Sequence, residues 1–319
     1  MYYIGVDLGG TNIAVGVTDE NGTILCKDSM KTLRDRSFEE ISGDIGNLCV
    51  GVLARARINS EEVNSIGIGT PGACDYNKGV LIYASTFKFK NADFKKALQK
   101  FINVPVYIEN DGNAAALAEC MAGGAKGAKN VIMITLGTGI GGGIIIDGCI
   151  YRGFNNVAGE LGHTVIVCGG QQCVCGRKGC FEMYASATAL TRMTREYVSN
   201  NPNSYISSIC GGKVDNISGK TAFLAARNGD KAGIELVEIY EEYLAEGLSN
   251  MINIFEPEVL IMGGGVCKEG EYLLAPIRQK IFEKIYTKSL DVPQTKIVEA
   301  ILGNDAGIVG AAMLGRKNV

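Results

Sequence analysis

The sequence contains no tryptophan, six prolines and a single histidine, and no apolar run reaches the roughly 18 residues that a membrane-spanning helix needs. The lack of such an apolar run argues against an integral membrane protein. Charged residues make up only 20% of the chain and the net charge is -3, so the protein lacks the strongly basic character of chains that bind nucleic-acid phosphates. The N-terminus also lacks the charged segment and the cleavage site of a signal peptide.

The chain has 319 residues, of which 46% are hydrophobic, with 43 glycines and 11 cysteines. The hydrophobic fraction excludes a disordered chain, and the length suggests two domains. An odd number of cysteines without secretory features argues against a disulfide framework and favours a reducing cytoplasm. Seven cysteines are scattered, most of them among apolar or small residues, as expected of small buried side chains. The other four lie close together between Cys168 and Cys180.

A β-meander at the N-terminus recurs near the middle of the chain. In each copy a glycine turn separates the first two predicted strands, and Leu136-Gly137 aligns with Leu8-Gly9 without a gap as far as Asp147 on Asp19. The pattern indicates an internal duplication, and therefore two α/β domains built on one plan. The predicted strands of the two copies are 2–7, 12–18 and 23–29, then 131–136, 141–146 and 149–151.

The remaining patterns predict helices joined by short buried strands, with no low-complexity linker between the halves. Asp93 and Asp230 are expected to be N-caps, because each precedes a run with helical periodicity. The predicted helices are 37–58, 93–101, 110–120, 230–255, 269–286 and 304–314, and the further strands are 63–69, 104–108, 259–262 and 296–301.

The two glycine turns are the first segments whose residues indicate ligand binding. Successive N–H groups in such turns can form a concave nest for an anion, and Asp7 at the strand end could hold a water on Mg²⁺. One such turn alone fits an ordinary hairpin. Two turns at duplicated positions favour a site that binds a polyphosphate from both sides. The residues are Asp7, Gly9, Gly10 and Thr11 in the first copy and Gly137, Thr138 and Gly139 in the second. Gly263, Gly264 and Gly265 follow another strand, and they fit either a plain turn or a place for a flat purine beside the backbone.

Asn110 and Asp111 lie where a strand ends and a helix begins. Either residue could simply cap the helix. Alternatively, Asp111 could be a general base that takes the proton of an attacking hydroxyl. Composition and spacing do not choose between these interpretations.

The most specific pattern is the cluster that contains the only histidine. His163, Cys173, Cys175 and Cys180 offer one imidazole and three thiolates within 18 residues, which is a standard set for a closed structural zinc site. Four ligands leave no open position for catalysis at the metal. Cys168 is a spare thiol that the spacing does not exclude as a ligand.

Taken together, these motifs resemble the ROK family of bacterial sugar kinases, most closely its glucokinases, over essentially the whole chain. The most specific match is Gly159-Glu160-Leu161-Gly162-His163 with Cys173-x-Cys175-Gly176-x-x-Gly179-Cys180-x-Glu182. The other matches, in order, are Asp7-x-Gly9-Gly10-Thr11, Pro71-Gly72, Glu109-Asn110-Asp111-Gly112-Asn113-Ala114, Leu136-Gly137-Thr138-Gly139, Gly263-Gly264-Gly265 and Gly303-Asn304-Asp305-Ala306-Gly307.

The resemblance implies an actin-like, ribonuclease-H-like α/β fold with ATP and sugar in a cleft between two domains. It implies a small domain over 1–120 completed by a C-terminal helix at 304–319, and a large domain over 121–303 with the zinc loop. The implied reaction is transfer of the γ-phosphoryl group of ATP, with Mg²⁺, to the 6-hydroxyl of glucose, a glycolytic step in the cytoplasm. A homodimer is also expected from the family.

The resemblance also implies roles for residues. Asp111 would be the catalytic base, and the sugar would be bound by Gly72, Asn110, Asp111, Glu160, His163 and Glu182. ATP would be bound by Asp7, the two glycine turns and the Gly263–Gly265 segment. His163 would place one ring nitrogen on a structural Zn²⁺ and the other on the sugar.

Two departures bear on the substrate. Asn12 stands where relatives usually carry lysine after Gly-Gly-Thr, which removes a charge near the phosphates, and residues 84–87 differ from a segment that lies near the sugar in relatives. N-acetylmannosamine, N-acetylglucosamine, allose and fructose therefore remain alternative acceptors. A sugar-sensing repressor is disfavoured because only six residues precede Asp7, and an actin-like ATPase without a sugar would have no use for the zinc-loop residues.

Overall fold

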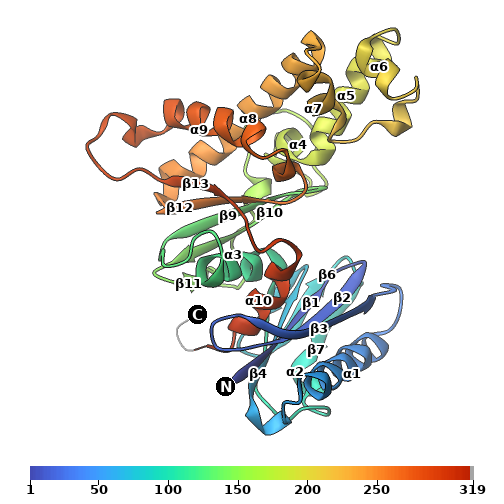
Figure 1. Ribbon diagram of the computed structural model, residues 1–319, viewed down its shortest axis with the longest axis vertical. Helices are drawn as coiled ribbons and strands as arrows, with labels where there is room; N and C mark the ends of the chain where they lie inside the picture. The colour runs from blue at the N-terminus through green and yellow to red at the C-terminus, as the bar shows by residue number, and fades with distance from the viewer. Residues whose placement is uncertain (317–319) are drawn as a thin grey trace. The chain divides into compact units, whose positions relative to one another are not determined.

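The computed structural model describes residues 1–316, which form two compact units (Figure 1). Unit 1 contains residues 1–133, 143–159 and the C-terminal segment from 300, and unit 2 contains residues 134–142 and 160–299. The domain boundaries expected from the sequence, at 120 and 303, stay a prediction, and the end of the expected C-terminal segment, 317–319, lies outside the described residues.

Unit 1 is built on a five-stranded sheet in the order β3-β2-β1-β4-β8. Its first three strands are antiparallel neighbours, whereas β1, β4 and β8 run parallel. Each of these strands had been expected from its apolar pattern, and the observed ends differ from the predicted ones by two residues or fewer. The strands are β1 (Tyr2–Leu8), β2 (Asn12–Thr18), β3 (Ile24–Lys31), β4 (Val63–Thr70) and β8 (Val106–Asn110).

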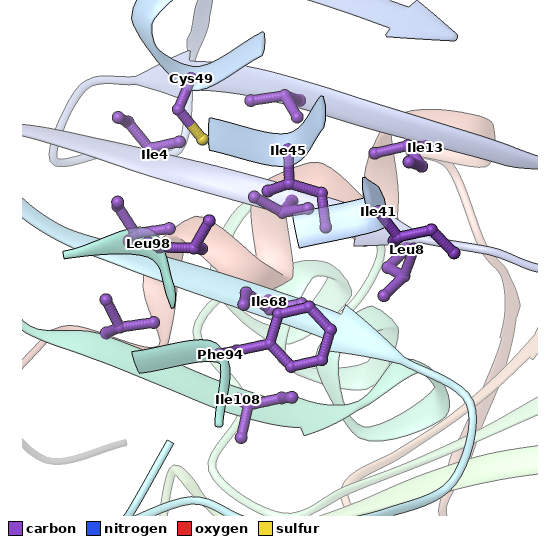
Figure 2. Close-up of a cluster of buried hydrophobic side chains, with 14 of the residues drawn as sticks. Ile4, Leu8, Ile13, Ile41, Ile45, Cys49, Ile68, Phe94, Leu98 and Ile108 are labelled. Carbon is purple, nitrogen blue, oxygen red and sulfur yellow. The ribbon is translucent and has the colours of Figure 1, made fainter. Parts of the chain in front are cut away.

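Helices pack on this sheet through side chains that alternate between its faces. Ile4 and Leu8 of β1 point into a core with Ile41, Ile45 and Cys49 of α1 (Phe38–Ala56), as Figure 2 shows. All of these side chains are fully buried, which makes this cluster a main source of hydrophobic stabilisation. The core also contains Phe94 and Leu98 of α2 (Phe94–Leu98), whose N-cap is Asp93 as predicted.

The C-terminal helix α10 (Ala306–Met313) packs against β1, β4 and α3 (Asp111–Ala122). Gly5 and Gly67 lie under it, and a Cβ atom at either position would collide with the α10 backbone. Glycines on this side of the sheet therefore let the helix approach closely, and they bring the chain end back to the first strand.

Unit 1 also contains a small antiparallel sheet in the order β5-β6-β7, which the sequence did not predict. Its strands are only three to five residues long, and their burial does not alternate regularly. The sequence therefore had no period-two signal there to reveal strands. These strands are β5 (Ala73–Asp75), β6 (Val80–Ala84) and β7 (Phe89–Asp93).

The second large sheet has the order β11-β10-β9-β12-β13, which repeats the order of the first sheet strand for strand. Its last two strands are parallel, like their counterparts. This repetition confirms the internal duplication and the actin-like, ribonuclease-H-like fold class. The strands are β9 (Val131–Leu136), β10 (Ile140–Ile146), β11 (Cys149–Ile150), β12 (Val259–Gly263) and β13 (Lys296–Glu299).

Unit 2 carries a helical layer around the long helix α8 (Lys231–Phe255). The side chain of its N-cap Asp230 accepts a hydrogen bond from the Gly233 amide at 2.8 Å, as the sequence predicted. Among residues 1–316 no helix is both long and apolar enough to cross a membrane. The other helices are α4 (Glu182–Ala185), α5 (Ala187–Asn200), α6 (Tyr205–Ile209), α7 (Thr221–Arg227) and α9 (Glu271–Lys284), of which only α9 was predicted.

Candidate active site and metal centre

The parallel strands of unit 1 bring several predicted site residues to one edge of the sheet. In the strand register Asp7 is opposite Gly69, and Thr70 is opposite Asn110. Ligands of open α/β sheets bind at the carboxyl ends of such strands. The edge formed by the ends of β1, β4 and β8 is therefore the part of unit 1 best placed to bind a substrate.

The helix that starts at this edge separates the roles of Asn110 and Asp111. Asn110 is the N-cap of α3, and its Oδ1 accepts hydrogen bonds from the amides of Gly112 at 2.9 Å and Asn113 at 3.3 Å. Its Nδ2 also donates to the Gly72 carbonyl at 3.5 Å. Because Asn110 caps the helix, Asp111 occupies the first helical position, where its carboxylate accepts a hydrogen bond from the Gly112 amide at 2.9 Å.

This junction is supported by Glu109, Arg152 and Tyr76, to which sequence analysis assigned no role. Glu109 is 3% exposed, forms a 2.6 Å ion pair with Arg152 and accepts a hydrogen bond from the Asn110 amide at 2.9 Å. The Arg152 guanidinium lies 4.0 Å from the centre of the Tyr76 ring. Since these residues come from distant segments, no local motif could have revealed the network that fixes the residue before Asn110.

Asp111 lies close enough to Asp7 to affect its ionisation. Withdrawal of the Asp7 carboxyl from water, together with the nearby charge of Asp111, raises the pKa of Asp7 to about 6. Asp111 is partly exposed, but the surrounding protein replaces enough water that desolvation raises its pKa as well. Two carboxyl groups with raised pKa values at one sheet edge are typical of a functional site.

The raised pKa of Asp7 predicts a pH-dependent stability. Since the folded state holds the proton more tightly than the unfolded state, the contribution of Asp7 to the free energy of unfolding should fall as pH rises from about 4 to about 6. Asparagine does not ionise, so Asp7→Asn should not show this fall in the free energy of unfolding. At pH 7.5 the variant should be more stable than wild type by about 2–3 kcal/mol. Urea unfolding of both proteins across this pH range measures the difference.

The exposed Asp35 of unit 1 supplies the control for that experiment. Asp35→Asn should change the free energy of unfolding by less than about 0.5 kcal/mol at either pH, as is usual at the surface. A constant difference between Asp7→Asn and wild type from pH 4 to 7.5 would contradict the shifted ionisation of Asp7.

The first glycine turn is closed by backbone hydrogen bonds. The Gly9 amide donates to the Asn12 carbonyl at 3.0 Å, and the Thr32 side-chain hydroxyl donates to the Gly9 carbonyl at 2.6 Å. Asn12, which replaces the lysine usual in relatives, is exposed and pairs across the strands with Lys31. The side chains of such a pair lie on one face of the sheet, so Lys31 places a positive charge beside position 12.

The second glycine turn, in unit 2, packs against the Gly263–Gly265 segment. Gly264 has φ +95°, and a Cβ there would collide with the Leu136 backbone just before the turn. A Cβ at Gly137 or Gly265 would meet no atom within 4 Å. The two segments assigned to a nucleotide therefore lie next to each other, with open backbone at both.

The four predicted zinc ligands converge in unit 2. The donor atoms of His163, Cys173, Cys175 and Cys180 all lie within 4.8 Å of one another. The distance from Cys173 Sγ to His163 Nδ1 is 3.6 Å, and that from Cys175 Sγ to Cys180 Sγ is also 3.6 Å. Zinc with bonds of about 2.0–2.3 Å to nitrogen and sulfur needs ligands roughly 3.5–3.8 Å apart in a tetrahedron, so this donor set fits the ion.

The loop around these ligands also contains Cys168, and it sets the orientation of the His163 ring. Cys168 is exposed and is not part of the converging set, so it is a spare thiol. His163 points Nδ1 toward the cysteines and leaves Nε2 4.0 Å from a carboxylate oxygen of Glu160. The histidine thus has one nitrogen for the ion and one for another ligand.

A cavity of about 600 Å³ lies elsewhere in unit 2, between α8 and α9. Five of its eleven lining residues are glutamates, among them Glu241, whose pKa is raised to about 7 by burial. None of the predicted site residues lines it. This cavity is therefore separate from both groups of residues described above.

Comparison with known proteins places these motifs in context. The profile of the ROK family matches residues 3–318. A glucokinase of Streptomyces coelicolor is 38% identical over 98% of this chain and 97% of its own length. The crystal structure of a ROK family glucokinase from Streptomyces griseus in complex with glucose and AMPPNP is 37% identical, with a TM-score of 0.78 over 98% of this chain and 99% of that one. A xylose repressor of Bacillus spizizenii is 29% identical over 98% of this chain but 76% of its own length.

Proposed function

The chain belongs to the ROK family, and on that premise we propose that it is an ATP-dependent hexose kinase that phosphorylates glucose at its 6-hydroxyl. The observation that carries the proposal is the 38% identity to a glucokinase over nearly the full length of both chains. The similarity to the glucokinase bound to glucose and AMPPNP supports the same sugar and nucleotide. The sugar kinase is favoured over a repressor because the repressor is less similar.

Unit 1 supplies the proposed base and part of the sugar site. Asp111 takes the proton of the attacking hydroxyl. Its carboxylate is available for this role because Asn110, and not Asp111, is the N-cap of the helix. Asn110 and Gly72, which are hydrogen-bonded to each other, contact the sugar beside it. Desolvation keeps the pKa of the Asp111 carboxyl above its usual value, which makes its carboxylate a stronger base.

Unit 2 supplies the other proposed sugar contacts and the metal site. Glu160, His163 and Glu182 bind sugar hydroxyls, with His163 acting through Nε2. A bound Zn²⁺ on His163, Cys173, Cys175 and Cys180 supplies structural cross-linking of the loop and no chemistry on the substrate.

The nucleotide is assigned to the two glycine turns. Gly9, Gly10 and Thr11, with Gly137, Thr138 and Gly139, line the phosphates. The amides of Gly10, Thr11, Thr138 and Gly139 are the donors, because those of Gly9 and Gly137 close their own turns. Gly263, Gly264 and Gly265 accommodate the purine. Asp7 would hold Mg²⁺ through a water, and the bound ion would neutralise negative charge on the phosphates. We also propose that the protein acts in the cytoplasm. The homodimer stays a prediction, which sedimentation velocity tests.

The proposal is tested by following ADP release from ATP with a panel of sugars. We expect kcat/KM for glucose to exceed that for N-acetylmannosamine, N-acetylglucosamine, allose and fructose by at least about tenfold, because a site built to hydrogen-bond each hydroxyl discriminates against altered sugars. Thr86 of the divergent 84–87 segment lies against Gly10 of the first turn, so this segment is the first place to look if another sugar is preferred. A protein that releases ADP with none of the sugars would exclude the kinase.

A further inference from the structure

One side chain in unit 2 touches both the zinc ligands and the second glycine turn. Glu182 Oε1 lies 3.4 Å from Cys173 Sγ and 3.6 Å from His163 Nδ1. Its other oxygen, Oε2, accepts a hydrogen bond from the Ile140 amide at 3.3 Å, at the end of the turn. Only 16% of the side chain is exposed, so the carboxyl group is held between the two sites.

The same segment holds the other end of the turn. The Ala187 amide donates to the Gly137 carbonyl at 2.9 Å, so residues 182–187 contact the turn at both of its ends. A Cβ at Gly139 would lie 2.5 Å from Glu182 Oε2, so a side chain at this position would displace the Glu182 carboxyl group. The shape of the turn therefore depends on the position of Glu182.

The zinc loop in turn fixes the start of this segment. Cys180 pairs with Val165 in a β-bridge, and the Phe181 amide donates to the Thr164 carbonyl at 2.7 Å. Gly162, next to His163, packs directly on the Ile140 carbonyl, which gives the loop a second contact with the turn. Metal binding orders such loops, because their ligands otherwise have no common centre.

We propose that Glu182 is a positioning residue that couples the zinc loop to the glycine turn, so that bound zinc raises the affinity for the phosphates of ATP. The inference rests on the proposed kinase function, and it gives Glu182 a role beyond contact with the sugar. The coupling runs from the zinc ligand Cys180 through the backbone contacts of Cys180 and Phe181 to Glu182, and from Oε2 of Glu182 to the amide of Ile140.

The first test compares two variants of Glu182 that can retain zinc, since Glu182 is not one of the four ligands. Glu182→Ala removes the acceptor for the Ile140 amide, and we expect AMPPNP to bind about tenfold more weakly by titration calorimetry, as for the loss of one hydrogen bond to a charged group. Glu182→Gln keeps an acceptor and should bind AMPPNP within about threefold of wild type. Both variants lose the same charge, so equal affinities of the two for AMPPNP would overturn the proposal.

The second test removes the zinc. In wild type we expect chelation to weaken AMPPNP binding about tenfold, whereas in Glu182→Ala, which is already uncoupled, it should cost less than about threefold. Zinc content and melting temperature are recorded for every sample, with Glu196→Gln on the exposed surface of α5 as control. Unchanged AMPPNP affinity in zinc-free wild type, or an equal loss in both proteins, would overturn the coupling.

The two tests also separate this inference from the proposed function. A zinc-loaded wild type that binds glucose but no AMPPNP would overturn the nucleotide site, and the coupling with it. A wild type that binds AMPPNP equally well with and without zinc would leave the kinase intact and overturn the coupling alone.

Discussion

Cys175→Ser is expected to lose its zinc and its glucose phosphorylation together. Purified wild type should contain about one zinc per chain, because three cysteines and His163 form a closed tetrahedral set. Serine cannot supply a thiolate, and a site with three ligands binds zinc far more weakly. Metal analysis and the ADP-release assay on the same samples measure both effects. We expect kcat/KM for glucose to fall by at least about 100-fold, because loss of a ligand should cost no less than the largest effects of residues next to a metal site.

Cys168→Ser is the matched control for this experiment. Cys168 lies in the same loop and is exposed, but it does not belong to the converging set. This variant should keep both zinc and activity. Full activity in wild-type protein freed of zinc would contradict a structural role for the ion.

The zinc set and the two large sheets could be predicted because their signals are local. All four ligands lie within 18 residues, so their spacing indicated the site, although it did not exclude Cys168. Each meander has its own apolar pattern, and the repeat of that pattern predicted two domains built on one plan. The two sheets share one strand order, in agreement with that prediction. The small sheet of β5, β6 and β7 was missed because its short strands lack alternation.

The contacts that hold the site residues in place could not be predicted in this way. Glu109 and Arg152 are 43 residues apart in sequence, and their ion pair depends on how β11 leads back to the start of α3. Gly139 was interpreted as making room for an anion, yet the atom closest to a side chain there belongs to Glu182. Such contacts are set by tertiary packing, which leaves no periodic trace in the sequence.

The helix cap at Asn110 makes Asp111 a decisive position for testing the mechanism. Asn110 already accepts hydrogen bonds from the amides of Gly112 and Asn113, so Asp111→Asn leaves the cap of α3 intact. The melting temperature and the affinity for glucose should therefore stay near those of wild type. Asp93, the N-cap of α2, provides a matched control, because Asn caps a helix as well as Asp and Asp93→Asn should keep full activity.

Asp111→Asn is expected to lower kcat by about 10²–10⁴-fold, which corresponds to roughly 3–5 kcal/mol of activation free energy. The amide keeps the size of the carboxyl group but cannot accept the proton of the sugar hydroxyl, and a hydroxyl that keeps its proton is a weak nucleophile toward the γ-phosphate. Single-turnover phosphorylation of glucose measures this step without product release. If the variant phosphorylates glucose at a near-normal rate, then Asp111 is not the base, and the proton must leave through another group at the ends of β1, β4 and β8.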